Sequence, residues 1–150
     1  MIKRIIRIIL IVAIAVLAIT GIYGGVALLL EPSGSNLALS INLLESTIFG
    51  SYIVPGLILL ILLGFFPTLT VFGLITRKKL RFANKLNIYK KRHWAWTYSL
   101  YCGLLLVLWI DVQVMMIGGG YILQSIYAIL GVVIIILTLT PSIMKFYKKK

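Results

Sequence analysis

Four long apolar stretches separated by polar segments dominate the pattern of this chain. They cover residues 8–30, 52–76, 95–117 and 121–144, and three of the four contain no charged residue. Each is long enough to cross a hydrocarbon core, which takes about 20 apolar residues in a helix. Backbone amides in lipid must be hydrogen-bonded within their own segment, so the pattern predicts helices. We expect an all-α, four-helix transmembrane bundle, with residues 1–150 forming a single integral membrane domain.

Composition and charge agree with this class. The chain is 61% hydrophobic and 12% charged, whereas a soluble domain has about 45–50% apolar and about 25% charged residues. The net charge of +12 would suggest nucleic acid in a soluble protein. Here the basic residues form short clusters between apolar runs, so we expect a lipid bilayer and no nucleic acid as the partner.

The distribution of the basic residues predicts the orientation. All fifteen Lys and Arg lie before the first stretch, between the second and third, or after the fourth. A four-span topology places these segments on one side, and cytoplasmic segments are rich in Lys and Arg. We therefore expect both termini in the cytoplasm and the plasma membrane of a bacterium as the location.

The outer connections have their own patterns. Leu37, Ile41, Leu44 and Ile48 are spaced i, i+4, i+7 and i+11 between polar residues, which predicts a short amphipathic helix over residues 37–49. Such a helix is either a lid over an outward-facing cavity or a cover for the end of the bundle. Three glycines at 118–120 predict a tight turn that makes the last two spans antiparallel neighbours.

The inner loop is strongly basic. Its charges should contact anionic lipid headgroups, which attract each basic residue by about 1 kcal/mol near the surface. Phe82, Leu86 and Tyr89 share one helical face there, and Trp94, Trp96 and Tyr98 then suggest an aromatic belt at the inner interface. The predicted headgroup contacts are Arg77, Lys78, Lys79, Arg81, Lys85, Lys90, Lys91 and Arg92.

Residue types that carry catalysis are scarce. The single histidine, His93, lies in the basic loop, and the sequence contains neither paired cysteines nor an acid cluster. A histidine-based triad within the membrane and a multi-histidine metal site are therefore excluded. We expect no catalytic residue, metal or cofactor, and a protein that is not an enzyme.

Asp111 is the one ionisable acid or base within a span. A charged side chain in a membrane is costly and normally faces a partner or water. In a hairpin centred on Gly119, Tyr127 lies level with Asp111, Gln124 lies one turn from Tyr127, and Tyr23 has a similar depth. Gln113 lies about 200° around the helix from Asp111 and should face another neighbour. The cluster either stabilises the contact between helices through hydrogen bonds or forms a functional site. The candidate residues of this polar cluster are Asp111, Tyr127, Gln124, Tyr23 and Gln113.

Gly21 and Gly25 form a G-x-x-x-G pattern in the first span. Such a motif permits close contact between helices. The contact is either internal to the bundle or between two copies of the chain.

Several short motifs together resemble a widespread family of small, uncharacterised bacterial four-span membrane proteins. They are Glu31-Pro32-Ser33-Gly34, Phe49 with Tyr52-Ile53-Val54-Pro55-Gly56-Leu57, Trp109-Ile110 with Gln113, and Leu123-Gln124 with Tyr127 and Gly131. The resemblance covers about residues 21–137 and implies the same topology without an assigned activity. In that family an acid often precedes the Tyr-x-x-Pro-Gly step, where this chain has Ser51, and the inner loop is usually shorter.

Three functions follow from these patterns. The first is a non-enzymatic accessory or structural subunit, with a homo-oligomer or another membrane protein as partner. The second is an oligomeric transporter or channel protomer that uses the Asp111 cluster for a proton, cation or small polar solute. The third, a membrane enzyme acting on lipid or quinone, lacks a second ionisable residue inside the membrane.

Overall fold

A computed structural model describes residues 1–45 and 47–149, and for Met116 it describes the backbone alone. Two 3-10 turns, η1 (Ser35–Leu37) and η2 (Ile41–Leu44), lie in the loop between the first two spans. No β-strand occurs within the described residues, so the all-α class is confirmed. The other helical elements are α1 (Ile2–Leu30), α2 (Ile53–Ile58), the π-helical η3 (Leu59–Phe65), α3 (Phe66–Thr76), α4 (Trp94–Ile117), α5 (Ile122–Leu139) and α6 (Pro141–Phe146).

Within the described residues, four helical stretches are long and apolar enough to cross a membrane, which confirms the number of predicted spans. They are Ile2–Leu30, Ile53–Thr76, Trp94–Met115 and Ile122–Leu139. The last one ends before residue 144 because Thr140, which precedes Pro141, takes an extended backbone with φ −60° and ψ 138°. A residue before proline is disfavoured in the helical region, so α6 begins as a separate helix.

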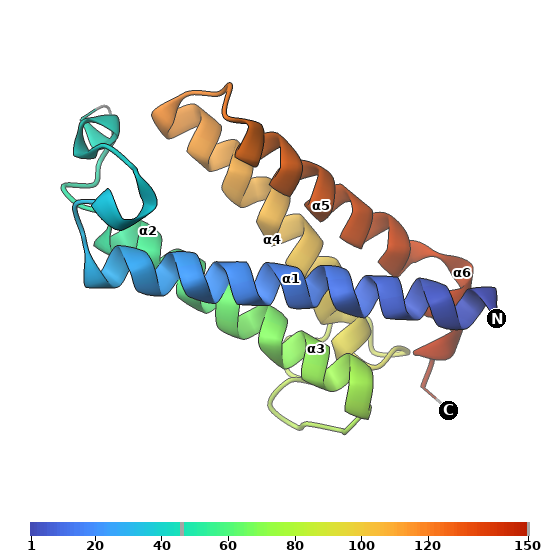
Figure 1. The fold of residues 1–150 in the computed structure, drawn as a ribbon. Coiled ribbons are helices and arrows are strands. Elements are labelled where there is room, and N and C mark those ends of the chain that lie inside the picture. Colours follow the sequence, from blue (N-terminus) through green and yellow to red (C-terminus); the bar gives the residue numbers. More distant parts are fainter. Residues whose placement is uncertain (46, 150) are drawn as a thin grey trace.

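The helices form two layers that diverge toward one end (Figure 1). α1 packs against α2, η3 and α3, and α4 packs against α5 as an antiparallel hairpin. Gly118 and Gly120 have φ values of 82° and 100°, which explains the glycines in this turn. Both chain ends lie at the end that holds residues 77–93 (Figure 1), which we call the basic end. The opposite end, with the loop 31–52 and the turn 118–120, is called the loop end.

The close contact between α1 and η3 depends on the glycines of α1. A Cβ atom placed on Gly21 would lie 2.0 Å from the backbone oxygen of Leu63, and one on Gly25 would lie 2.7 Å from the backbone nitrogen of Leu60. The G-x-x-x-G pattern therefore serves a contact within the bundle. In η3, Phe66 N–H donates to Ile61 O, five residues back. The wider π-helical turn accommodates Pro67, whose ring would collide with the carbonyl of Leu63 in a regular helix.

The predicted amphipathic helix over residues 37–49 is not confirmed, because the described residues of this loop form only the two short 3-10 turns η1 and η2. Ala38 adopts a left-handed backbone with φ 53°, which ends η1. Ser40 then caps η2, because its hydroxyl accepts a hydrogen bond from Asn42 N–H at 3.2 Å. Leu44 is buried, whereas Ile48 is 92% exposed, so the four spaced apolar residues do not share one buried face. Ser46, within the predicted helix, lies outside the described residues.

The three aromatic residues at the start of α4 are buried in the protein rather than arranged as an interfacial belt. Trp94, Trp96 and Tyr98 are at most 2% exposed. Each donates to a backbone oxygen: Trp94 Nε1 to Lys78 at 2.8 Å, Trp96 Nε1 to Thr138 at 2.9 Å and Tyr98 Oη to Ala83 at 3.0 Å. The belt prediction was wrong because the loop 77–93 folds back over α4 and supplies two of these oxygens, and α5 supplies the third.

Candidate binding cavity

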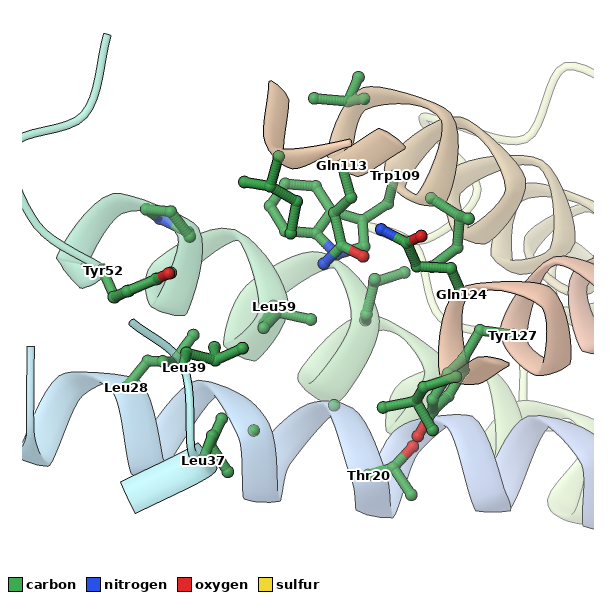
Figure 2. Close-up of a pocket in the computed structure, with 18 of the residues that line it drawn as sticks. Thr20, Leu28, Leu37, Leu39, Tyr52, Leu59, Trp109, Gln113, Gln124 and Tyr127 are labelled. Atoms are coloured by element: carbon green, nitrogen blue, oxygen red, sulfur yellow. The ribbon is translucent and has the colours of Figure 1, made fainter. Parts of the chain in front are cut away.

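A cavity of about 460 Å³ lies at the loop end, between the two diverging layers (Figure 2). Side chains of α1, α2, η3, α4 and α5 form its walls, and residues of the loop 31–52 also line it. Pockets of roughly 300–1,000 Å³ are typical for small-molecule ligands. The cavity is therefore large enough for a ligand of that size.

The cavity exists because each layer is tightly packed while the layers are splayed. Within the α4–α5 hairpin, a Cβ on Gly103 would lie 2.6 Å from Ile135 Cγ1 and 2.9 Å from the backbone oxygen of Gly131. On α1, by contrast, Gly24 lines the cavity and has open space around it, since a Cβ there would meet only Leu59 Cδ1 at 3.8 Å. Leucines, glycines and aromatic residues form most of the wall.

Tyr52 fixes the loop beside the cavity. Its hydroxyl donates to Ser40 O at 2.9 Å, and its ring packs against Gly34, whose φ is 83°. Tyr52 N–H also donates to Pro32 O at 3.0 Å, which joins the two ends of the loop. Burial raises the pKa of the Tyr52 hydroxyl above 10.0, and the nearby Tyr121 adds to that rise. The hydroxyl therefore remains a neutral hydrogen-bond donor at physiological pH.

Three polar side chains gather on the α4–α5 side of the cavity: Trp109, Gln113 and Gln124 (Figure 2). Gln124 is 8% exposed, and its Nε2 donates to Gly118 O at 3.2 Å across the hairpin turn. Its Oε1 is buried without a hydrogen-bond partner among the described residues, and the same is true of Trp109 Nε1. A buried donor or acceptor left unpaired costs about 1–3 kcal/mol. The wall thus carries one unused acceptor and one unused donor.

Four of the five residues of the predicted polar cluster line this cavity: Gln113, Gln124, Tyr127 and Tyr23. Tyr127 of α5 points across the cavity toward Thr20 of α1 (Figure 2). Tyr23 stands at the edge, since its side chain is 67% exposed.

The prediction for Asp111 was wrong. Asp111 is exposed and does not line the cavity. The inner face of α4 is taken by Leu106, Trp109, Ile110 and Gln113, at i, i+3, i+4 and i+7. The expected angle of about 200° between Asp111 and Gln113 is consistent with this placement, because Gln113 faces the cavity. Counting residues from the hairpin turn gave the depth of Gln124 and Tyr127, which line the cavity. It did not predict the rotation of α4 about its axis, which turns Asp111 outward.

The basic loop 77–93 consists of turns and extended backbone and contains no helix. Asn87 is fully buried and anchors it, whereas Phe82, Leu86 and Tyr89 are exposed. Seven of the eight predicted headgroup contacts are exposed, namely Arg77, Lys78, Lys79, Arg81, Lys85, Lys90 and Lys91. Arg92 is half-buried, stacks 4.8 Å from the Trp96 ring and donates to Met144 O.

His93 has a structural role that the sequence did not reveal. Its Nδ1 accepts from Ala95 N–H at 3.2 Å, which caps α4, and its Nε2 lies 3.2 Å from Lys78 O. Both contacts fit a neutral ring that is protonated on Nε2. Burial lowers the pKa of His93 below 6.5, and the charges of Arg77 and Lys149 lower it further, although hydrogen bonds to Lys78 and Arg77 backbone oxygens oppose this.

Acidification should therefore weaken the fold through His93. Below about pH 6.5 His93 is protonated in the unfolded chain but stays neutral in the folded protein, because its pKa is lowered there. The free energy of unfolding therefore falls with decreasing pH until the pH passes the lowered pKa. His93→Asn keeps a capping acceptor and should flatten this dependence, whereas His93→Ala should cost about 1 kcal/mol at neutral pH. Thermal unfolding followed by tryptophan fluorescence from pH 8 to 5 provides the measurement. An equal pH dependence in His93→Asn and the parent would contradict the assignment.

No group of three or more His, Cys, Asp or Glu that could hold a metal occurs in the described part of the chain. Comparisons with protein-family models, curated proteins and solved structures found no match. The family resemblance stays a prediction.

Proposed function

We propose that this protein is a non-enzymatic, multi-pass protein of the bacterial plasma membrane, an accessory or structural subunit whose loop-end cavity holds one neutral lipid-like molecule. The observation that carries the proposal is an apolar cavity wall with an unpaired buried acceptor on Gln124 and an unpaired buried donor on Trp109. A hydroxyl or amide can both donate and accept, and so would satisfy these two atoms.

The charge of the wall supports a neutral ligand. The described residues that line the cavity include tyrosines but no Asp, Glu, Lys, Arg or His. Burying a charged headgroup without a partner is very unfavourable. An apolar body with a small hydrogen-bonding head is the chemistry that fits this wall.

Ion transport through an Asp111 cluster receives less support, because Asp111 is exposed on α4 outside the cavity. The outward position of Asp111 instead supports a role as an accessory subunit. An intramembrane carboxyl that faces outward is stabilised when a neighbouring protein, or a second copy of the chain, hydrogen-bonds it.

We also propose that the basic end lies in the cytoplasm. Ser35 and Lys85 are both exposed and lie at opposite ends of the bundle, and the single cysteine, Cys102, is buried. In intact cells a membrane-impermeant maleimide should label Ser35→Cys, and it should label Lys85→Cys only after permeabilisation. Labelling in the reverse order would refute the orientation.

The ligand proposal is tested with a long-chain fatty alcohol that carries a photoreactive diazirine, added to the full chain in phosphatidylcholine nanodiscs. Cross-links should concentrate on cavity-lining peptides of α4 and α5. Gly24→Leu fills open space in the cavity and should remove most of these cross-links. Val26→Leu is the matched control, because Val26 is exposed on the same helix and does not line the cavity.

Trp109→Phe tests the polar contact separately. It removes a donor that is unpaired in the described structure, so stability without ligand should be unchanged. Loss of one hydrogen bond worth about 0.5–1.5 kcal/mol should weaken binding of the alcohol about two- to tenfold. Equal cross-linking of the parent and Gly24→Leu, or unchanged binding in Trp109→Phe, would argue against the proposed site.

A further inference from the structure

A second cavity, of about 510 Å³, lies at the basic end between the start of α1 and α6. α1 contributes Lys3 and Arg7, which are four residues apart and so share one helical face. α6 contributes Ser142, Lys145 and Phe146. None of the residues of the loop-end cavity takes part, so this site is independent of the proposed function.

Two guanidinium groups converge on the ring of Phe146 beside this cavity. Arg7 Cζ lies 4.3 Å from the ring centroid, and Arg77 Cζ lies 4.8 Å from it. With Lys3 and Lys145, four cations are brought together by three separate parts of the chain. Stacking on a ring holds each guanidinium in place but does not neutralise it.

No acidic side chain of the described residues compensates for these charges. The three acids of the chain are Glu31, Glu45 and Asp111. The first two lie in the loop 31–52, and Asp111 lies in the half of α4 nearer the loop end. The first turn of α1 likewise contains no acid, although Lys3 stands at the positive end of the helix dipole. The arrangement is therefore one that a bound anion stabilises.

A hydrogen-bonding group is also unused here. Ser142 Oγ is buried without a partner among the described residues. Arginine and lysine together with a hydroxyl are the groups that bind phosphate oxygens, and arginine can bind two of them at once. Phe146, whose side chain is 37% exposed, also lines this cavity and offers an apolar surface for acyl chains.

We propose that the cavity formed by Lys3, Arg7, Ser142 and Lys145, with Arg77 beside it, binds the phosphate group of an anionic phospholipid. The basic residues of the loop 77–93 attract a charged surface in general, whereas this site holds one headgroup. Adjacent apolar surface favours a lipid over free phosphate as the source of the phosphate group.

The test titrates the full chain in an uncharged detergent with dioctanoyl phosphatidylglycerol, dioctanoyl phosphatidylcholine or inorganic phosphate at constant ionic strength. Affinity is measured by native mass spectrometry, and stabilisation is measured by thermal unfolding. The variant Lys3→Gln/Arg7→Gln/Lys145→Gln removes three charges from the site. The variant Lys79→Gln/Lys85→Gln/Lys91→Gln removes three charges from exposed positions of the loop and is the matched control.

Phosphatidylglycerol should bind and stabilise the parent, and its affinity should fall at least about tenfold in the site variant but less than about twofold in the loop variant. Ser142→Ala should weaken binding without lowering the unfolding temperature of the unliganded protein. Equal losses in the two triple variants would overturn the site in favour of diffuse attraction. Saturation by inorganic phosphate at the same affinity would overturn the lipid as its source, and no response to either anion would overturn the proposal.

Discussion

Gly21→Ala should be the most damaging single-methyl substitution in this bundle. The added Cβ would lie 2.0 Å from the backbone oxygen of Leu63 and 2.4 Å from its carbonyl carbon. Neither atom can rotate away as a side chain does, so α1 and η3 must separate. Overpacking typically costs about 1–3 kcal/mol, and we expect at least the upper value here.

Gly24→Ala is the control for this prediction. Its Cβ would make only an ordinary contact with Leu59 Cδ1 at 3.8 Å, and alanine is favoured over glycine in a helix interior by about 1 kcal/mol. Unfolding of both variants in mixed micelles, followed by circular dichroism, compares them directly. Equal stability of Gly21→Ala and Gly24→Ala would show that the close contact between α1 and η3 is absent in solution.

Asn87→Ala should be the most damaging polar substitution at the basic end. Asn87 is fully buried, its Nδ2 donates to Arg92 O at 3.0 Å, and its Oδ1 accepts from the Thr97 hydroxyl at 2.5 Å. Alanine leaves the buried Thr97 hydroxyl and the Arg92 carbonyl unpaired. At about 1–3 kcal/mol for each of the two unpaired groups, we expect a total loss of about 2–6 kcal/mol.

A double-mutant cycle separates this hydrogen bond from general packing. In Asn87→Ala/Thr97→Val both partners are gone, so the double variant should be more stable than the sum of the two single losses implies. Asn36→Ala, at an exposed loop position, is the control and should change stability by less than about 0.5 kcal/mol. Additive losses in the cycle would contradict the role given to the pair.

The spans and the α4–α5 hairpin were predictable because they depend on the local sequence and not on contacts between distant residues. Span length and hydropathy locate each helix, and Gly118–Gly120 locate the reversal. The residues of the loop-end cavity were partly predictable for the same reason, since depth along a hairpin follows from counting residues from its turn. This is how Gln124 and Tyr127 were found, whereas Gln113 was expected to face another neighbour.

The remaining features depend on tertiary contacts that the sequence pattern does not encode. The sequence pattern places Trp94 and Trp96 at the membrane interface, but in the structure both are buried and donate to backbone oxygens of the loop 77–93 and of α5. The rotation of α4 is set by which face buries Trp109 and Ile110, and that rotation places Asp111 outside. The spacing of Leu37, Ile41 and Leu44 predicted a helix, but Ala38 and Ser40 interrupt it locally.

The central claim, that the loop-end cavity holds one neutral lipid-like molecule, is tested most directly by native mass spectrometry of the protein extracted from its own membrane in a mild detergent. We expect the parent and Val26→Leu to retain one neutral adduct per chain. Gly24→Leu, which fills the cavity beside Leu59, should lose it while keeping its unfolding temperature. An adduct retained equally by Gly24→Leu, or a parent that carries none, would contradict the claim.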